Sequence, residues 1–89
     1  MTKILQDINL GANLKRIRNS KGLTQEEVCA KLSVMGRPMM QNNYAQIESG
    51  KRNIFLSDLI ALKEIFGVSY DELFKDLKPL SKYDTDDNS

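Results

Sequence analysis

The feature that most constrains this chain is a pair of helix signals that follow one another in its first half. Residues 22–27, GLTQEE, place a threonine three residues before a glutamate, which is the pattern of a capping box at the start of a helix. Residues 44–52, YAQIESGKR, have an apolar edge and an amide-rich edge, and a glycine typical of a helix end follows. The sequence therefore predicts two short helices in succession.

Apolar residues recur at helical spacing elsewhere too, and no segment shows convincing strand-like alternation. Helices are expected at residues 10–20, 25–36, 40–49, 56–66 and 70–78, with Asn9, Thr24 and Ser69 as N-caps and Pro79 ending the last. Ser69 and Glu72 would form a second capping box. The expected inward residues are Leu10, Leu14, Ile17, Val28, Leu32, Met35, Tyr44, Ile47, Leu59, Leu62, Phe66, Tyr70, Leu73, Phe74 and Leu77. The predicted fold class is all-α, with five short helices.

A chain of 89 residues holds one domain. We expect an N-terminal extension at 1–8, the helical domain at 9–78, and a disordered acidic tail at 79–89. A domain of this size buries a modest core, which favours a symmetric homodimer. No apolar run is long enough to span a membrane, and the N-terminus lacks the pattern of a secretory signal.

The composition argues against an enzyme. The chain has no histidine and a single cysteine, so it lacks the base of a serine-type triad and the ligands of a zinc site. We therefore expect no catalytic residues, no metal, no cofactor and no small-molecule substrate. A lone cysteine, Cys29, forms no internal disulfide and fits a reducing, cytoplasmic compartment.

Charge is divided unevenly along the chain, although the net charge is only +1. Residues 10–54 carry eight cations and three acids, a net +5, whereas residues 55–89 carry four lysines and eight acids, a net −4. Such a division on its own fits an ordinary solvated surface. Because it coincides with the helix pair, it supports one cationic face.

Three separate segments, LKRIRNSKGLTQEEVCAKL, YAQIESGKRN and GVSYDELF, resemble the helix-turn-helix domain of the phage-repressor (Cro-like, Xre-type) family of transcriptional regulators. The resemblance covers Leu10 to Phe74 and keeps the family's order of motifs. It implies a five-helix domain whose second and third helices form the helix-turn-helix. It also implies sequence-specific binding of double-stranded operator DNA, usually as a dimer, and repression of transcription.

The third helix is the expected recognition helix, and its outer edge carries amides in place of charges. Amides pair with adenine in the major groove, so Gln41, Asn42 and Gln46 are the predicted base-reading residues. A merely solvated face would favour glutamate and lysine instead. The predicted contacts to the DNA backbone come from Lys15, Arg16, Lys21, Gln25, Asn43, Lys51 and Arg52.

The resemblance also implies contacts within the domain. Arg18 and Glu48 match a family ion pair that joins the first helix to the third, and Gln25 matches a glutamine that braces the recognition helix. Cys29 takes the place of a small residue packed against the third helix, so a buried and inert thiol is expected.

The connection between the second and third helices departs from the family, because residues 33–39 lengthen a turn that is usually tight. We expect extra helix followed by a longer turn, with Met39 in the apolar turn position and Met40 in the cap position. Met35, Met39 and Met40 are expected to fill the core around the insertion. Gln41 then reaches either a base or only a phosphate, depending on where the third helix begins.

A second hypothesis makes this chain a protein-interaction module, such as an antitoxin or a controller partner. Its docking surface would be the apolar stripe of Tyr70, Phe74 and Leu77 in the acidic half. DNA binding should weaken steeply with salt, whereas protein docking need not, which separates the two hypotheses.

Overall fold

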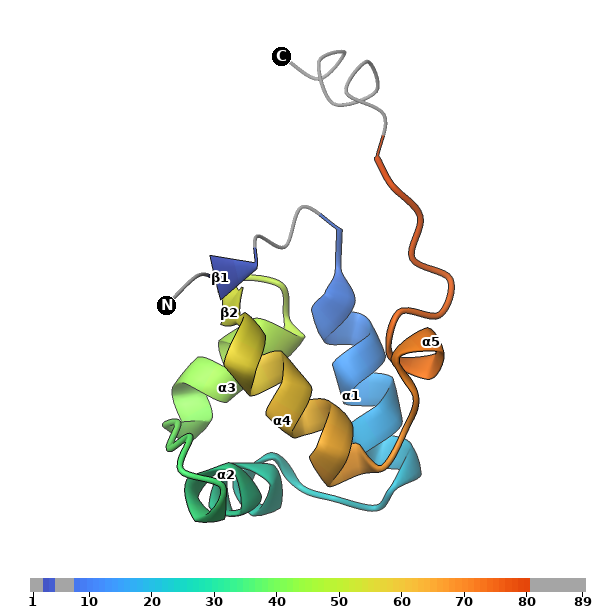
Figure 1. Ribbon diagram of the computed structural model, residues 1–89. Coiled ribbons are helices and arrows are strands. Elements are labelled where there is room, and N and C mark those ends of the chain that lie inside the picture. Colours follow the sequence, from blue (N-terminus) through green and yellow to red (C-terminus); the bar gives the residue numbers. More distant parts are fainter. Residues whose placement is uncertain (1–2, 5–7, 81–89) are drawn as a thin grey trace.

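The computed structural model describes residues 3–4 and 8–80. In this part of the chain, five helices and two short strands follow in the order β1 (Lys3–Ile4), α1 (Leu10–Ser20), α2 (Gln25–Val34), α3 (Gln41–Glu48), β2 (Ile54–Phe55), α4 (Leu56–Phe66) and α5 (Tyr70–Leu73). The predicted all-α class is confirmed, and α2 and α3 form the helix-turn-helix (Figure 1). None of these helices is long and apolar enough to cross a membrane.

Local capping accounts for where the first two helices begin. The side chain of Asn9 accepts a hydrogen bond from the backbone nitrogen of Ala12 at 3.1 Å, which caps α1. The predicted capping box of α2 is complete. Thr24 Oγ1 accepts from the Glu27 amide at 3.0 Å, and Glu27 Oε1 accepts from the Thr24 amide at 2.9 Å. Both starts are thus encoded by residues within one turn of the helix end.

The helices enclose one apolar core. α1 packs against α3 and α5, while α2 packs against α3 and α4 (Figure 1). The buried apolar side chains are Leu10, Leu14, Ile17, Val28, Leu32, Tyr44, Ile47, Ile54, Leu59, Ala61, Leu62, Phe66 and Leu73. This arrangement leaves α3 supported from behind by two helices, so that its other face remains outside the core.

Gly11 allows α1 and α3 to approach closely. A Cβ atom at this position would lie 2.1 Å from the carbonyl oxygen of Ile47 and 2.5 Å from that of Glu48. Both oxygens belong to the backbone near the end of α3, so a rotamer change cannot relieve the overlap. A residue without a side chain is therefore required where α1 crosses α3.

The structure adds one short pair of strands that the sequence analysis did not anticipate. β1 pairs antiparallel with β2, with Lys3 opposite Phe55 and Ile4 opposite Ile54. Two-residue strands are too short to produce a recognisable alternation, and β1 lies within the predicted N-terminal extension. The disordered tail was predicted for 79–89, of which 81–89 lie outside the described residues.

The last helix is shorter than its apolar pattern predicts. α5 ends at Leu73 instead of continuing to Pro79, and the side chain of Asn13 donates to the carbonyls of Leu73 and Lys75 at 3.1 and 2.9 Å. Because Asn13 of α1 already bonds these carbonyls, they are not used for further helical hydrogen bonds.

The second capping box is also incomplete. Ser69 accepts a hydrogen bond from the Glu72 amide, but the Glu72 carboxylate pairs with Arg16 and not with the Ser69 amide. Because α5 ends at Leu73, Phe74 lies beyond the helix, and it is exposed.

The connection between α2 and α3 has the expected form of extra helix plus a longer turn. Gly36, with φ of 79°, ends α2 in a Schellman motif. Its amide donates to the carbonyl of Ser33 at 3.0 Å, and the Arg37 amide donates to that of Leu32 at 2.9 Å.

The burial of the methionines was predicted only partly correctly. Met39 packs against the core, but Met35 and Met40 are exposed, the latter by 70%. The early end of α2 turns Met35 outward, and Met40 becomes the N-cap of α3 at the surface.

Candidate nucleic-acid interface

The outward face of α3 is formed by uncharged amides. Tyr44 and Ile47 point into the core, whereas Gln41, Asn42 and Gln46 are exposed. Residues 42 and 46 lie one turn apart on the same face of the helix. Asn42 and Gln46 therefore share one exposed face of α3. Gln41, the first residue of the helix, is also exposed but lies about 140° around the helix axis from Gln46.

The inner end of α3 is fixed to α1 by a buried ion pair. Arg18 Nε donates to Glu48 Oε2 at 2.7 Å and Arg18 Nη2 donates to Glu48 Oε1 at 3.0 Å, so the pair is bidentate. Gln25, at the start of α2, adds a donor to Glu48 Oε1 at 3.1 Å. One carboxylate thus ties α1, α2 and α3 together, and it orients the recognition helix without reaching its outer face.

The environment of this carboxylate keeps it charged. Burial acts to raise the pKa of Glu48, but the donor groups around it, led by Arg18, outweigh burial and lower that pKa. The hydrogen bond with Glu48 is the main cause that raises the pKa of Arg18. Tyr44 lies beside the same carboxylate, and burial first, followed by Glu48, raises the pKa of its phenol.

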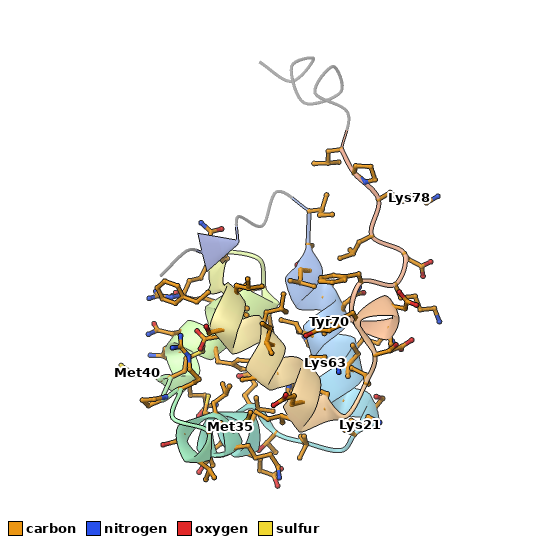
Figure 2. All side chains as sticks on the ribbon, in the orientation of Figure 1. Lys21, Met35, Met40, Lys63, Tyr70 and Lys78 are labelled. Carbon is orange, nitrogen blue, oxygen red and sulfur yellow. The ribbon has the colours of Figure 1, made fainter. Side chains whose placement is uncertain are left out.

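The predicted backbone-contacting residues do not all lie close together. Lys51 and Arg52 follow α3 directly and are exposed, and Asn43 on α3 is half-buried. Lys15 and Lys21 are exposed on or just after α1. Figure 2 shows Lys21 on the opposite side of the view from Met40, so Lys21 lies far from the start of α3.

Arg16 is already engaged within the chain. Its Nη1 atom donates to Glu72 Oε1 of α5 at 3.0 Å, and both side chains are largely exposed. A partly exposed pair of this kind contributes little stability. The contact of Arg16 with DNA stays a prediction, and in the free protein this cation faces the acidic half of the molecule.

Sequence reasoning missed one ion pair near the start of α3. Arg37 Nε donates to Asp58 Oδ1 at 2.7 Å and links the α2–α3 connection to the first turn of α4. Asp58 is only 6% exposed. An acidic residue in a first helical turn is common for dipole reasons, so nothing in the sequence singled it out.

Two observations on the described residues concern metal binding and thiol reactivity. None of them forms a group of three or more histidine, cysteine or acidic side chains that could hold a metal ion. Cys29 is half-buried and unpaired, and burial raises the pKa of its thiol, which disfavours the reactive thiolate.

Comparison with known proteins agrees with this arrangement. The family model for helix-turn-helix domains matches residues 14–73. An uncharacterized HTH-type transcriptional regulator, y4dJ of Sinorhizobium fredii, is 39% identical over 64 residues, which cover 72% of this chain and 77% of the relative. The control protein C.MunI of a Mycoplasma species is 33% identical over 72 residues, covering 80% of this chain and 90% of the relative.

The same fold is found in a solved structure. The restriction-modification controller protein C.AhdI of Aeromonas hydrophila superposes with a TM-score of 0.64 at 25% identity, over 75% of this chain and 94% of that one. The matched family segment contains α2, α3 and the Arg18–Glu48 pair. The chain therefore belongs to the helix-turn-helix family of Cro-like, Xre-type proteins and is a DNA-binding transcriptional regulator.

Proposed function

We propose that this regulator binds an inverted-repeat operator as a homodimer in the cytoplasm and represses transcription there. The observation that carries this proposal is the exposed, uncharged amide face of α3, held from behind by the Arg18–Glu48 pair. An amide offers both a donor and an acceptor to a base edge, and can therefore pair with N6 and N7 of an adenine in the major groove. A rigid backing keeps those groups in register with the base pairs.

The proposed contacts divide into two classes. Specificity comes from Gln41, Asn42 and Gln46 on base edges. Affinity comes from phosphate contacts, for which the candidates are Lys15, Arg16, Lys21, Gln25, Asn43, Lys51 and Arg52. Gln25 serves both as a brace for Glu48 and as a first-turn group at the N-terminus of α2, where an anion is favoured.

The homodimer is proposed to form through the exposed apolar residues of α4 and α5. Tyr70 and Phe74 are 46% and 41% exposed, while Leu77 packs against the core and drops out of the predicted stripe. The ammonium of Lys63 lies 4.9 Å from the centroid of the Tyr70 ring, so α4 and α5 meet here. Ile60, also exposed, precedes Lys63 by one turn of α4 and extends the same surface.

Selection from a random duplex pool at two salt concentrations tests this proposal. We expect an inverted-repeat consensus with half-sites about one helical turn apart, and affinity that falls steeply with salt. A pool without any enriched sequence would overturn the proposal. Capture of a protein partner together with salt-insensitive binding would favour the interaction module instead.

Two single substitutions separate base reading from phosphate contact. Gln46→Ala should lose roughly 1–3 kcal/mol of discrimination at one or two base positions, because a bidentate amide contact is removed. Lys51→Ala should instead weaken binding to every sequence alike and reduce the salt slope by about one. Titration of matched and mismatched duplexes measures both. Equal effects of Gln46→Ala on all duplexes would contradict its assignment to a base.

A second candidate function is control of a restriction–modification system. The names of two relatives, C.MunI and C.AhdI, describe control or controller proteins, and the second shares the fold over most of its length. Such a regulator would act on genes for a methyltransferase or an endonuclease. The selected consensus should then occur upstream of a methyltransferase or endonuclease gene that neighbours the gene of this regulator. If the consensus does not occur there, this candidate function is excluded.

A further inference from the structure

The start of α3 is weakly defined by its own sequence. Met40 is the N-cap residue, its backbone is extended, and its side chain makes no capping hydrogen bond. The first helical hydrogen bond runs from the Tyr44 amide to the Met40 carbonyl at 3.0 Å. Gln41 and Asn42 occupy this first turn, so two of the three proposed base-reading residues lie where the helix lacks a side-chain cap.

The packing behind this turn is also open. A surface pocket of about 220 Å³ lies between the α2–α3 connection, α3, β2 and α4, and its lining includes Pro38, Met39, Met40, Asn43 and Asp58. Of the last three residues of the connection, only Met39 packs against the core, whereas Pro38 and Met40 are exposed.

An ion pair joins the α2–α3 connection to α4. The Arg37 guanidinium reaches the Asp58 carboxylate at 2.7 Å, and Asp58 is buried in the first turn of α4. The next residue, Leu59, is part of the core, so the acceptor is mounted on a rigid support. Arg37 precedes Met40 by three residues, and the pair therefore restrains the connection just before the recognition helix begins.

We propose that Arg37 and Asp58 are positioning residues that set the start of α3 and thereby bring Gln41 and Asn42 to base edges. This inference rests on the proposed function. Without the tether, the uncapped first turn frays or shifts, and Gln41 falls back to a phosphate contact. Gln46 lies further along α3, near the Arg18–Glu48 anchor, and does not depend on the tether.

Two variants that change the net charge in opposite directions test this inference. Arg37→Ala removes a cation and Asp58→Asn removes an anion, but both break the same contact. Their overall affinities for DNA should shift in opposite directions. Both should lose discrimination at the base pairs read by Gln41 and Asn42, by roughly fivefold or more, and keep it at the pair read by Gln46. Random-duplex selection with each purified full-length variant measures this profile.

Matched controls separate positioning from general stability. Glu72→Gln removes another Arg–carboxylate pair, far along the sequence from α3, and should leave base preference unchanged. Arg37→Lys keeps a cation within reach of Asp58 and should restore part of the lost discrimination. A purely structural role would lower thermal stability in Arg37→Ala and Asp58→Asn without altering which bases are preferred, and that outcome would overturn the inference.

Hydrogen exchange tests the tether without DNA. Exchange at the Tyr44 amide should accelerate at least several-fold in Arg37→Ala and Asp58→Asn, while the Ser49 amide, which donates to Ala45 near the end of α3, stays protected. Uniform acceleration along α3 would contradict a tether confined to its start. If the wild-type protein selects no duplex sequence, the proposed function fails; if it does and the variants keep its full preference, only the positioning role fails.

Discussion

Individual residues at the crossing of α1 and α3 determine how the recognition helix is held. Gly11 permits contact between the two backbones, and Arg18 on α1 pairs with Glu48 at the end of α3. These contacts act at one end of α3 and on its inner side. They leave the outer amide face accessible while restricting rotation of the helix about its axis.

Gly11→Ala should destabilise the protein by about 1–3 kcal/mol, because the added methyl group overlaps backbone atoms of α3. Urea unfolding followed by circular dichroism measures the change. Asn19→Ala, on the exposed face of the same helix, serves as a control and should leave stability unchanged or slightly higher. Full stability of Gly11→Ala would show that α1 and α3 can separate without cost.

Glu48→Gln should cost about 3–5 kcal/mol at neutral pH, because Arg18 remains buried without a countercharge. The pKa of Glu48 is lowered in the folded protein, so the unfolded state binds this proton at higher pH than the folded state. The stability from the pair is complete above the unfolded pKa of about 4.3 and is lost as pH falls through the lowered folded pKa.

Acidification from pH 7 to about 3 should therefore narrow the stability gap between wild type and Glu48→Gln. Urea unfolding of both proteins across this range provides the comparison. A gap that stays constant would mean that ionisation of Glu48 does not contribute to folding.

At the scale of the element, α3 combines a well-defined end with a weakly defined beginning. Its end has Gly50 beyond the cap, and the Lys51 amide donates to the carbonyl of Gln46 at 2.9 Å. Its beginning has only Met40 as a cap. The exposed Met40 side chain contributes little burial, so the cap position tolerates a shorter polar residue.

Met40→Ser should stabilise the protein by about 0.5–2 kcal/mol, because serine supplies the missing acceptor at an N-cap whose backbone is already extended. Thermal unfolding measures the gain. Thr24→Ala, which removes a cap already present on α2, should change stability by a similar amount in the opposite direction. A decrease in stability for Met40→Ser would indicate that the methionine side chain packs more than its exposure implies.

At the scale of the whole molecule, the two halves of the chain carry different surfaces. Among the described residues, the cations of the first half lie mostly on or just after α1 and α3. The acids of α4 and α5 lie in the second half, on the elements that also carry the exposed Ile60 and Tyr70. A dimer joined through α4 and α5 would keep this acidic surface away from DNA and present two recognition helices.

Phe74→Ser should weaken dimerisation by at least tenfold and should cost less monomer stability than truncation of a fully buried phenylalanine, because Phe74 is 41% exposed in the isolated chain. Sedimentation equilibrium over a range of concentrations measures the dissociation constant. Operator affinity should fall in parallel, because two half-sites are then no longer bound together. An unchanged oligomeric state would place the dimer interface elsewhere.

The sequence by itself determined the number and order of the helices, the side-chain caps of α1, α2 and α5, and the amides of α3. Those features depend on residues within one or two turns of each other, so periodicity and capping patterns reveal them. The family followed separately, from the resemblance of three segments between Leu10 and Phe74. The lengthened α2–α3 connection was also expected, because Gly36 and Pro38 are residues that end or interrupt a helix.

Only the tertiary structure decided the features that join distant segments. Asn13 ends α5 across 60 residues of sequence, β1 pairs with β2, and Arg37 meets Asp58 across 21. Each depends on a polar group that has several possible partners until packing brings one of them within hydrogen-bond distance. Local sequence patterns cannot choose among such partners. The folded core can, because it fixes which polar groups lie within hydrogen-bond distance of each other.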